Sequence, residues 1–256
     1  MAKSQDIVYG VNPVLEKLKA SPNDILELLI SDGSDRTVLQ LIRREAHRLG
    51  LRSRTVNSKT LDRLAGGRRH QGVAVIVEPY RYSTLTDMLQ SISASTNSER
   101  ILILDGLTDP RNFGALLRTA EAVGVRYVLI PKDRSVEVNP IVFKTSAGAA
   151  HHVNIVKVTN LRHAISILKE NGYWIAGLDT QSQESVYDRE YPPRLAIVLG
   201  SEGKGVRPVN SRECDFLVSI PMRGKVASLN VAVAGAIFLY ELLRQERQRT
   251  KEVPGR

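Results

Sequence analysis

The longest uncharged apolar stretch of the chain lies near its C-terminal end, at residues 229–240, and it predicts a helix that is apolar on every side. Such a helix belongs in a core or a tight interface, and this one is too short for a bilayer, which needs about 20 apolar residues. Ser228 is a suitable N-cap. Gly235, in the middle of the helix, predicts that another backbone packs close to it.

From Glu99 onward, short apolar runs alternate with helical patterns. The predicted strands are 101–104, 127–130, 153–158, 173–178, 195–199 and 216–220. Continuous apolar strands that alternate with helices are typical of a parallel sheet covered on both faces. We therefore expect an α/β domain over residues 99–246, followed by a flexible tail at 247–256.

Residues 1–78 predict a second, smaller α/β domain. Its expected strands, at 25–30, 52–56 and 72–77, are separated by helical patterns. Residues 79–98 contain Pro79 and a polar run of Ser, Thr and Asn, with space for one short helix. Such a composition is typical of a linker, so we place the domain boundary there.

The net charge of the chain indicates which class of partner it binds. The net charge of +9 and the isoelectric point near 9.8 favour a polyanion, most often nucleic acid. Residues 41–70 carry nine cations and two acids, so that segment has a charge of 9 − 2 = +7. Its glycine-rich end makes Arg68, Arg69 and His70 candidate RNA contacts. A solvated face with no partner is the alternative.

The remaining composition indicates the class of protein and its cellular compartment. Hydrophobic residues make up 42% of the chain and charged residues 25%, as in globular proteins. Cys214 is the only cysteine, which rules out an intrachain disulfide. The first ten residues lack the apolar segment of a signal peptide. We expect a cytoplasmic protein, and no His, Cys and Asp spacing predicts a metal site.

Three loops follow strands of the predicted parallel sheet, at the edge where such sheets bind ligands. The first, at residues 109–120, places Asn112 near a helix start. Arg111 and Arg118 are seven residues apart and share a helix face. Arg111 is a candidate RNA contact. Surface ion pairs would explain both arginines equally well.

The second and third loops are rich in glycine and small polar residues. Residues 198–205, Val-Leu-Gly-Ser-Glu-Gly-Lys-Gly, lack the ending of a phosphate-binding Walker loop. Glu202 would also repel a phosphate. The loop therefore suits a ligand without a pyrophosphate, or it is only a tight turn. The third loop spans residues 220–234. A position at a helix start would explain Ser228 and Asn230 as well as a functional role would.

Together and in this order, the three loops resemble the SpoU family of RNA ribose 2′-O-methyltransferases in the SPOUT superfamily. The matching motifs are N-F-G-A-L-L-R-T-A (112–120), V-L-G-S-E-G-K-G (198–205) and I-P-M-R-G-K-V-A-S-L-N-V-A-V-A (220–234). The resemblance covers about residues 99–245. I-V-Y-G-V-N-P-V-L-E (7–16) and H-Q-G-V-A-V (70–75) resemble the family's ribosomal-protein-like RNA-binding domain. This layout is similar to the 23S rRNA guanosine 2′-O-methyltransferase branch, whereas the shorter tRNA enzymes lack that domain.

The resemblance implies a deep trefoil knot that holds S-adenosylmethionine, and a homodimer whose interface uses the apolar helix. One site would then draw residues from both subunits. The implied cofactor contacts are the main chains of Gly200, Ile220 and Leu229 and, more weakly, Leu178, Thr180 and Met222.

The implied reaction is in-line attack by a ribose 2′-hydroxyl on the sulfonium methyl group. The family assigns Arg118 a direct part in activating that hydroxyl. Because arginine stays protonated in proteins, we expect Arg118 to clamp the target phosphate and orient the hydroxyl. Asn112 would hold the ribose or Arg118, and Glu202 would fix the second loop. Ser228 and Asn230 would position the site from the third.

Three alternatives remain beside a 23S rRNA enzyme. A tRNA guanosine 2′-O-methyltransferase shares the motifs. A non-catalytic RNA-binding ribosome-assembly factor also fits the basic N-terminal segment. A protein that only binds RNA would, however, gain little from an acidic residue such as Glu202 beside RNA phosphates. A nicotinamide-dependent oxidoreductase is disfavoured, because no G-x-G-x-x-G follows the strand at Ile101.

Overall fold

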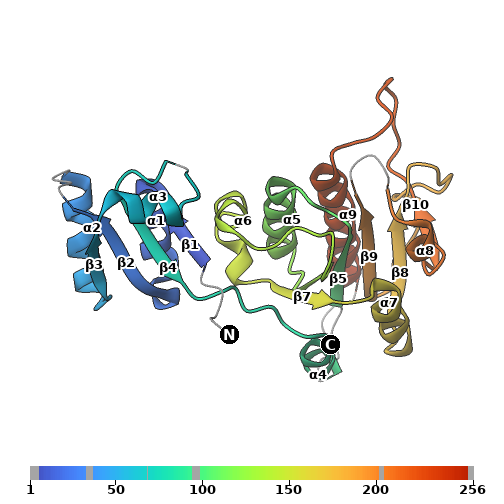
Figure 1. The fold of residues 1–256 in the computed structure, drawn as a ribbon. Helices are drawn as coiled ribbons and strands as arrows, with labels where there is room; N and C mark the ends of the chain where they lie inside the picture. The colour runs from blue at the N-terminus through green and yellow to red at the C-terminus, as the bar shows by residue number, and fades with distance from the viewer. Residues whose placement is uncertain (1–5, 33–36, 68, 94–98, 202–204, 253–256) are drawn as a thin grey trace. The chain divides into compact units, whose positions relative to one another are not determined.

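The chain divides into two units, Met1–Arg81 and Tyr82–Arg256, in a computed structural model that describes residues 6–32, 37–67, 69–93, 99–201 and 205–252 (Figure 1). Each unit has its own sheet and its own apolar core. Each is therefore described by itself.

The first unit is a four-stranded sheet in the order β1-β4-β2-β3, with β3 parallel to β2 and the other pairs antiparallel. Helices α1 and α2 bury their apolar side chains against one face, and α3 covers the other with Leu61. The elements are β1 (Asp6–Tyr9), α1 (Val11–Ala20), η1 (Pro22–Asp24), β2 (Ile25–Ser31), α2 (Thr37–Arg48), β3 (Ser53–Val56), α3 (Ser58–Leu64) and β4 (Val73–Val77).

The second unit is a six-stranded sheet in the order β10-β8-β9-β5-β6-β7, and every strand pair is parallel. This confirms the predicted parallel α/β architecture. The elements are α4 (Leu85–Ser93), β5 (Glu99–Asp105), α5 (Pro110–Ala122), β6 (Tyr127–Pro131), α6 (Pro140–Thr145), η2 (Ala149–His151), β7 (Asn154–Val158), α7 (Leu161–Glu170), β8 (Trp174–Leu178), β9 (Arg194–Gly200), α8 (Pro208–Ser211), β10 (Phe216–Val218) and α9 (Val231–Glu252).

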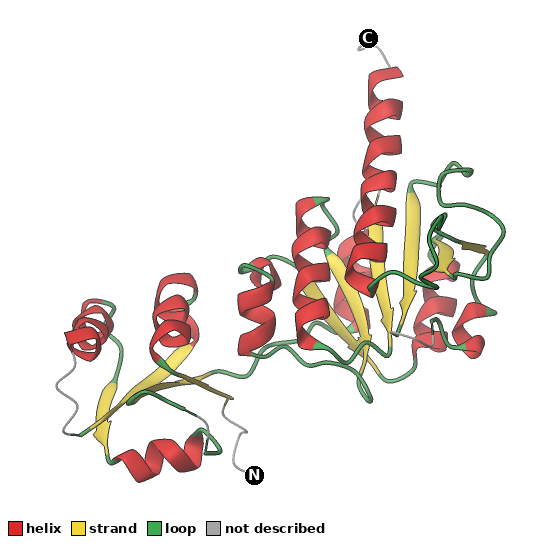
Figure 2. Cartoon of the chain, turned by 90° about the horizontal axis from the view of Figure 1, so that it is seen from above, coloured by secondary structure: helices red, strands yellow, loops and turns green. Residues whose placement is uncertain are grey.

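Helices cover both faces of this sheet. Helices α4 and α7 pack with Ile101 and Ile103 of β5 on one face. Helices α5 and α9 lie side by side on the other (Figures 1 and 2). Gly235 of α9 leaves no space for a side chain, since an added Cβ would lie 2.5 Å from Leu116 and 2.6 Å from Leu199. The close neighbours of Gly235 are thus leucine side chains, whereas we expected a backbone.

The segment 79–98 differs from the expected linker. Helix α4 lies within it, and Met88 and Ile92 are buried in the core of the second unit. Apolar residues at helical spacing from Leu85 onward let this helix pack against the sheet. Its polar flanks made the segment resemble a linker in the sequence.

Helix α9 begins later and ends later than predicted. Its N-cap is Asn230, whose Oδ1 accepts hydrogen bonds from the main-chain nitrogens of Ala232 at 2.9 Å and Val233 at 3.3 Å. The prediction that Ser228 caps the helix was therefore wrong. The helix runs to Glu252, so residues 247–252 of the expected flexible tail are helical, and 253–256 lie outside the described residues.

Candidate active site

A cavity of about 690 Å³ opens at the carboxyl edge of the six-stranded sheet. This volume lies within the range of small-molecule sites, about 300–1,000 Å³. Its walls come from the ends of β8 and β9, the loop after β10 and the first turns of α9. The structure brings together there the six residues expected at the cofactor, Leu178, Thr180, Gly200, Ile220, Met222 and Leu229.

The glycine-rich loop after β9 folds back tightly on itself. Ser201 and Gly205 exchange two main-chain hydrogen bonds, at 3.0 and 3.1 Å. A Cβ on Gly200 would lie 1.8 Å from the carbonyl carbon of Gly205, so no larger residue fits without moving backbone. The loop therefore presents bare main chain to the cavity, as close approach of a ligand to a backbone requires. Glu202, inside the loop, lies outside the described residues.

A buried carboxylate holds the end of this loop. Asp105 ends β5, is paired in register with Gly200, and is fully buried. Its two oxygens accept hydrogen bonds from Arg207, one from the main-chain nitrogen at 2.8 Å and one from Nε at 2.5 Å. The charge of Asp105 is thus balanced where the loop returns to the sheet.

Asn112 and Asn230, which are 118 residues apart, are hydrogen bonded to each other. The Nδ2 of Asn230 donates to Oδ1 of Asn112 at 3.0 Å, while the Oδ1 of Asn230 caps α9. The Nδ2 of Asn112 donates to Asp109, the N-cap of α5, at 3.3 Å. This chain of polar groups joins the starts of α5 and α9. It gives Asn112 a structural contact that the motif alone does not reveal.

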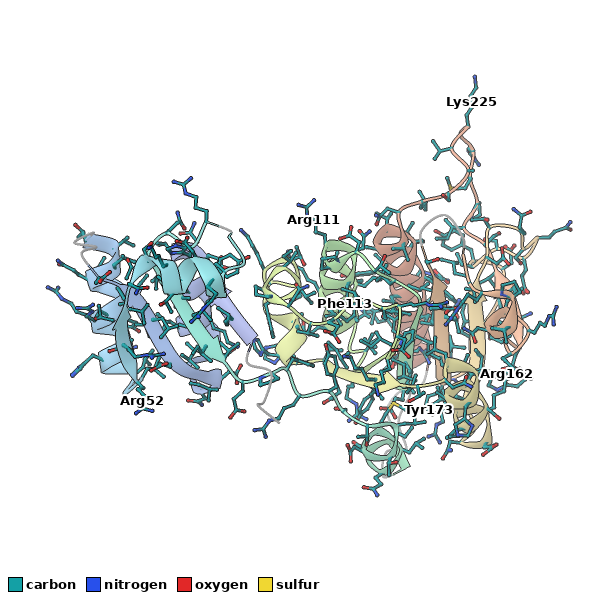
Figure 3. The ribbon with its side chains drawn as sticks, in the orientation of Figure 1. Arg52, Arg111, Phe113, Arg162, Tyr173 and Lys225 are labelled. Carbon is teal, nitrogen blue, oxygen red and sulfur yellow. The ribbon has the colours of Figure 1, made fainter. Side chains whose placement is uncertain are left out.

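Ser228 and Asn230 also line the cavity, at the end of an exposed loop. Every residue from Pro221 to Ser228 is exposed, including Val226 at 69%. Lys225 lies far out on this loop, and Arg111, at the start of α5, points to the same side (Figure 3). Arg111 and Lys225 therefore face solvent on the same side of the second unit.

Arg118 does not line the cavity formed by its own chain. Its side chain is exposed on α5 and has no hydrogen bond or ion pair with another described residue. It lies six residues after Asn112, about 120° away around the helix. The structure thus brings Ser228 and Asn230 to the cavity and leaves Arg118 at the surface.

The RNA candidates of the first unit have different environments. Arg69 is exposed, and Arg68 lies outside the described residues. His70 is buried, its Nδ1 accepts from the nitrogen of Gly72 at 3.0 Å, and its Nε2 contacts Asp62 at 3.1 Å. Both ring nitrogens of His70 are therefore engaged within the first unit.

Several cavity residues were not among the predicted site residues. They are Asp179, Gln181, Leu199, Ser201, Gly205, Val206, Val231 and Ala234. The first two flank Thr180 after β8. Their place at the carboxyl end of a parallel strand, where ligands bind, could have identified them as cavity residues. The last two lie one turn apart at the start of α9, on the side that faces the sheet.

Among the described residues, no group of three or more His, Cys, Asp or Glu side chains could hold a metal ion. None of the described helices is both long and apolar enough to cross a membrane.

Family models match both units of the chain. The model described as the SpoU rRNA Methylase family matches residues 99–240, which include the cavity and all three motifs. The chain belongs to the SpoU rRNA methylase family. A second model, described as RNA 2′-O ribose methyltransferase substrate binding, matches residues 7–83 and thus the first unit.

Relatives of this methylase extend over nearly its whole length. It is 41% identical to the 23S rRNA (guanosine-2′-O-)-methyltransferase RlmB of Shewanella oneidensis, over 96% of this chain and 99% of that protein. Its fold is similar to the SpoU methyltransferase AviRb from Streptomyces viridochromogenes in complex with AdoMet, with a TM-score of 0.73 at 22% identity over 95% of this chain and 91% of that one. The TrmH/SpoU tRNA modifying enzyme of A. aeolicus, at 28% identity and a TM-score of 0.55, matches only 65% of this chain and 86% of its own.

Proposed function

We propose that this SpoU methylase transfers a methyl group from S-adenosylmethionine to the ribose 2′-hydroxyl of a guanosine in 23S rRNA. The observation that carries the proposal is the cavity at the carboxyl edge, where the second and third motifs meet around the bare main chain of Gly200. The RlmB relative, similar over almost the whole of both chains, supports the choice of substrate. The ribosomal substrate in turn supports a cytoplasmic location.

The residues of the cavity fit the proposed cofactor. Apolar side chains from Leu178, Ile220 and Met222 suit the apolar parts of the molecule, and main-chain groups near Gly200 suit its polar edges. When bound, S-adenosylmethionine supplies an activated methyl group, so the protein has to align the hydroxyl and accept its proton. Leu178, Ile220, Met222 and the main chain near Gly200 would thus hold the group that supplies the methyl for the ribose oxygen.

Arg118 and Glu202 are proposed to act on the ribose side of this reaction. Arg118 stays protonated, so it binds the target phosphate and orients the hydroxyl. Glu202 fixes the glycine-rich loop. Since Arg118 does not line the cavity of its own chain, we propose that each active site receives Arg118 from the partner of a homodimer.

Exposed apolar residues support the dimer and the use of α9 in it. Val233 and Tyr240, on α9, are 48% and 53% exposed, whereas Phe238 and Leu239 of the same helix are buried. A shallow hollow of about 380 Å³ lies on α9 beside Tyr240, Leu243 and Arg247. A helix that is buried on one side and apolar on another is typical of an interface.

We further propose that the last part of the second unit is tied in a trefoil knot. Three features support it. The chain leaves β9, crosses β8 to form β10 at the sheet edge, and then returns to pack α9 against α5 and β9. Since knots are rare, the family resemblance is an essential part of this proposal.

The first unit is proposed to select the RNA. Its exposed cations include Arg69 and the arginines of α2 and β3, which suit phosphate contacts. A truncated chain that begins at Tyr82 should keep cofactor binding and lose most methylation of 23S rRNA. Tyr82 is the sharper starting point than Glu99, because α4 belongs to the core of the second unit.

The test of the function is methyl transfer in vitro. Purified protein is incubated with methyl-labelled S-adenosylmethionine and either unmodified 23S rRNA or tRNA, and the labelled ribose is mapped. We expect label in a guanosine of 23S rRNA. Label in tRNA alone would support the tRNA alternative, and RNA binding without transfer would support the assembly factor.

Variants connect the reaction to its residues. Arg118→Ala and Glu202→Ala should abolish transfer while the fold and the oligomeric state stay intact. Glu121→Ala is the matched control, since Glu121 is exposed on the same helix as Arg118. Wild-type turnover in either active-site variant would refute the role given to that residue.

A further inference from the structure

One wall of the cavity is a segment without regular secondary structure, residues 179–191, which we call the wall loop. Its first residues, Asp179, Thr180 and Gln181, line the cavity, and the rest leads back to β9. No helix or strand ladder of its own maintains its shape. Its shape therefore depends on its contacts with other elements.

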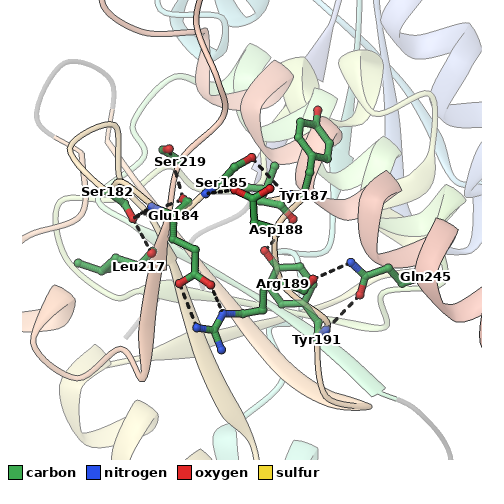
Figure 4. A network of polar contacts seen from close by, with 11 residues as sticks. Ser182, Glu184, Ser185, Tyr187, Asp188, Arg189, Tyr191, Leu217, Ser219 and Gln245 are labelled. Atoms are coloured by element: carbon green, nitrogen blue, oxygen red, sulfur yellow. Dashed lines mark hydrogen bonds and ion pairs between the residues drawn. The ribbon is translucent and has the colours of Figure 1, made fainter.

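The near half of the wall loop is bonded to β10 and the residue after it. Ser182 Oγ donates to the carbonyl of Leu217 at 2.7 Å. The main-chain nitrogen of Ser219 donates to the carbonyl of Glu184, and that of Val186 donates to the carbonyl of Ser219, both at 2.8 Å (Figure 4). Because Ile220 follows directly, these bonds join the two walls of the cavity to each other.

The far half of the wall loop is held by α9, chiefly through the side chain of Gln245, which is only 7% exposed. Its Oε1 accepts from the main-chain nitrogen of Tyr191 at 3.1 Å. Its Nε2 donates to the carbonyl of Arg189 at 2.9 Å (Figure 4) and also to Oε1 of Glu241 at 2.7 Å. Arg249 adds a bond to the carbonyl of Tyr191 at 2.5 Å.

Only an amide side chain can satisfy this arrangement. Gln245 faces a main-chain donor, a main-chain acceptor and the carboxylate of Glu241, and an amide carries both an acceptor and donors. A glutamate would set a second carboxylate against Glu241 and against the carbonyl of Arg189. A leucine would leave a buried donor and a buried acceptor unpaired.

Tyr191 transmits this contact back toward the cavity. It is 1% exposed, packs against Phe238 of α9 with ring centroids 5.1 Å apart, and donates its hydroxyl to the carbonyl of Val186 at 3.0 Å. Val186 is the residue bonded to Ser219. A continuous chain of contacts thus runs from Gln245 to the residues beside the cavity.

The same helix forms the opposite wall directly. Val231 and Ala234, in its first turns, line the cavity. Gln245 lies 245 − 231 = 14 residues further along, about 21 Å at 1.5 Å per residue. We infer that Gln245 is a positioning residue for the cofactor: it fixes the wall loop to α9 and so sets the spacing between the two sides of the cavity. This inference rests on the proposed function, which places S-adenosylmethionine in this cavity.

The test compares Gln245→Glu and Gln245→Leu with the full-length wild type. We expect the KM and Kd for S-adenosylmethionine to rise about tenfold, a change of 1.4 kcal/mol, while kcat at saturating cofactor and the affinity for RNA stay unchanged. Hydrogen exchange of the amides in 186–191 should accelerate. A purely structural role would lower the melting temperature and leave the KM for cofactor unaltered.

The matched control is Gln183→Glu, which makes the same chemical change at an exposed position of the wall loop. It should behave as wild type. If both Gln245 variants bind cofactor normally, the inference is wrong, and if Gln245→Glu does not fold, Gln245→Leu decides. Thr180→Trp, which fills the cavity, separates the two proposals: normal cofactor binding in that variant would refute the cavity itself as the cofactor site.

Discussion

Removing the guanidinium of Arg207 should destabilise the second unit and loosen the glycine-rich loop. The substitution Arg207→Ala leaves the fully buried carboxylate of Asp105 with one hydrogen bond, from the main-chain nitrogen of residue 207. Hydrogen bonds to charged groups contribute about 1.5–3 kcal/mol, and removing one partner of a fully buried pair costs about 3–5 kcal/mol. The Arg207 side chain is 49% exposed. In the variant, water can therefore replace part of the hydrogen bonding that Arg207 gives to Asp105. We expect the free energy of unfolding to fall by about 2 kcal/mol.

Urea unfolding followed by tryptophan fluorescence measures the loss of stability of the second unit. Trp174, the only tryptophan, lies on β8 of that unit. In thermal unfolding the loss corresponds to a melting temperature about 4–8 °C lower for a domain of this size. Cofactor affinity should fall too, since Gly200, Gly205 and Val206 line the cavity. Arg212→Ala, an exposed arginine after α8, is the control. A loss below about 0.5 kcal/mol, the usual range for surface substitutions, would show that Asp105 does not depend on Arg207.

Three further outcomes follow from single positions. Gly200→Ala should abolish cofactor binding in calorimetry, because its Cβ would lie 1.8 Å from Gly205, whereas Gly224→Ala, which meets no atom within 4 Å, should bind normally. Burial raises the pKa of the Cys214 thiol to about 12. The folded state therefore keeps a proton that the unfolded chain loses near pH 9, so unfolding free energy should fall between pH 8 and pH 10, and Cys214→Ala should remove that part of the pH dependence. Arg69→Glu should weaken RNA binding and reduce the slope of its salt dependence, measured by titration at several salt concentrations, and an unchanged slope would exclude a phosphate contact.

The strands of the second unit were predictable because their burial is nearly complete. All seven residues of β5 are buried, and its middle, 101–104, shows as the unbroken apolar run expected of a strand covered on both faces. Strand β1 was missed, because Asp6–Tyr9 is short and becomes a strand only by pairing with β4. Pairing between distant segments is tertiary information that local pattern does not carry.

The cavity residues of the second and third loops were predictable from their motifs, but individual roles were not, and Asp179 and Gln181 after β8 were missed. Ser228 and Asn230 are both suitable N-cap residues by type. In the structure Asn230 caps α9, and it is also hydrogen bonded to Asn112. His70 belongs to a cationic run, yet Asp62 and the nitrogen of Gly72 engage its ring. Such contacts depend on the folded environment of each side chain, which residue type and spacing leave open.

The paired amides of Asn112 and Asn230 constrain how this sequence can change in evolution. Because Asn230 turns its oxygen toward the start of α9, its nitrogen must face Asn112, and each amide determines the orientation of the other. A change to aspartate at position 230 would preserve the cap but set two oxygens against each other. Single replacements at either site should therefore be disfavoured, and a loss at one should be compensated most readily by a second change at the other. The two sites should behave genetically as one unit, although 118 residues separate them.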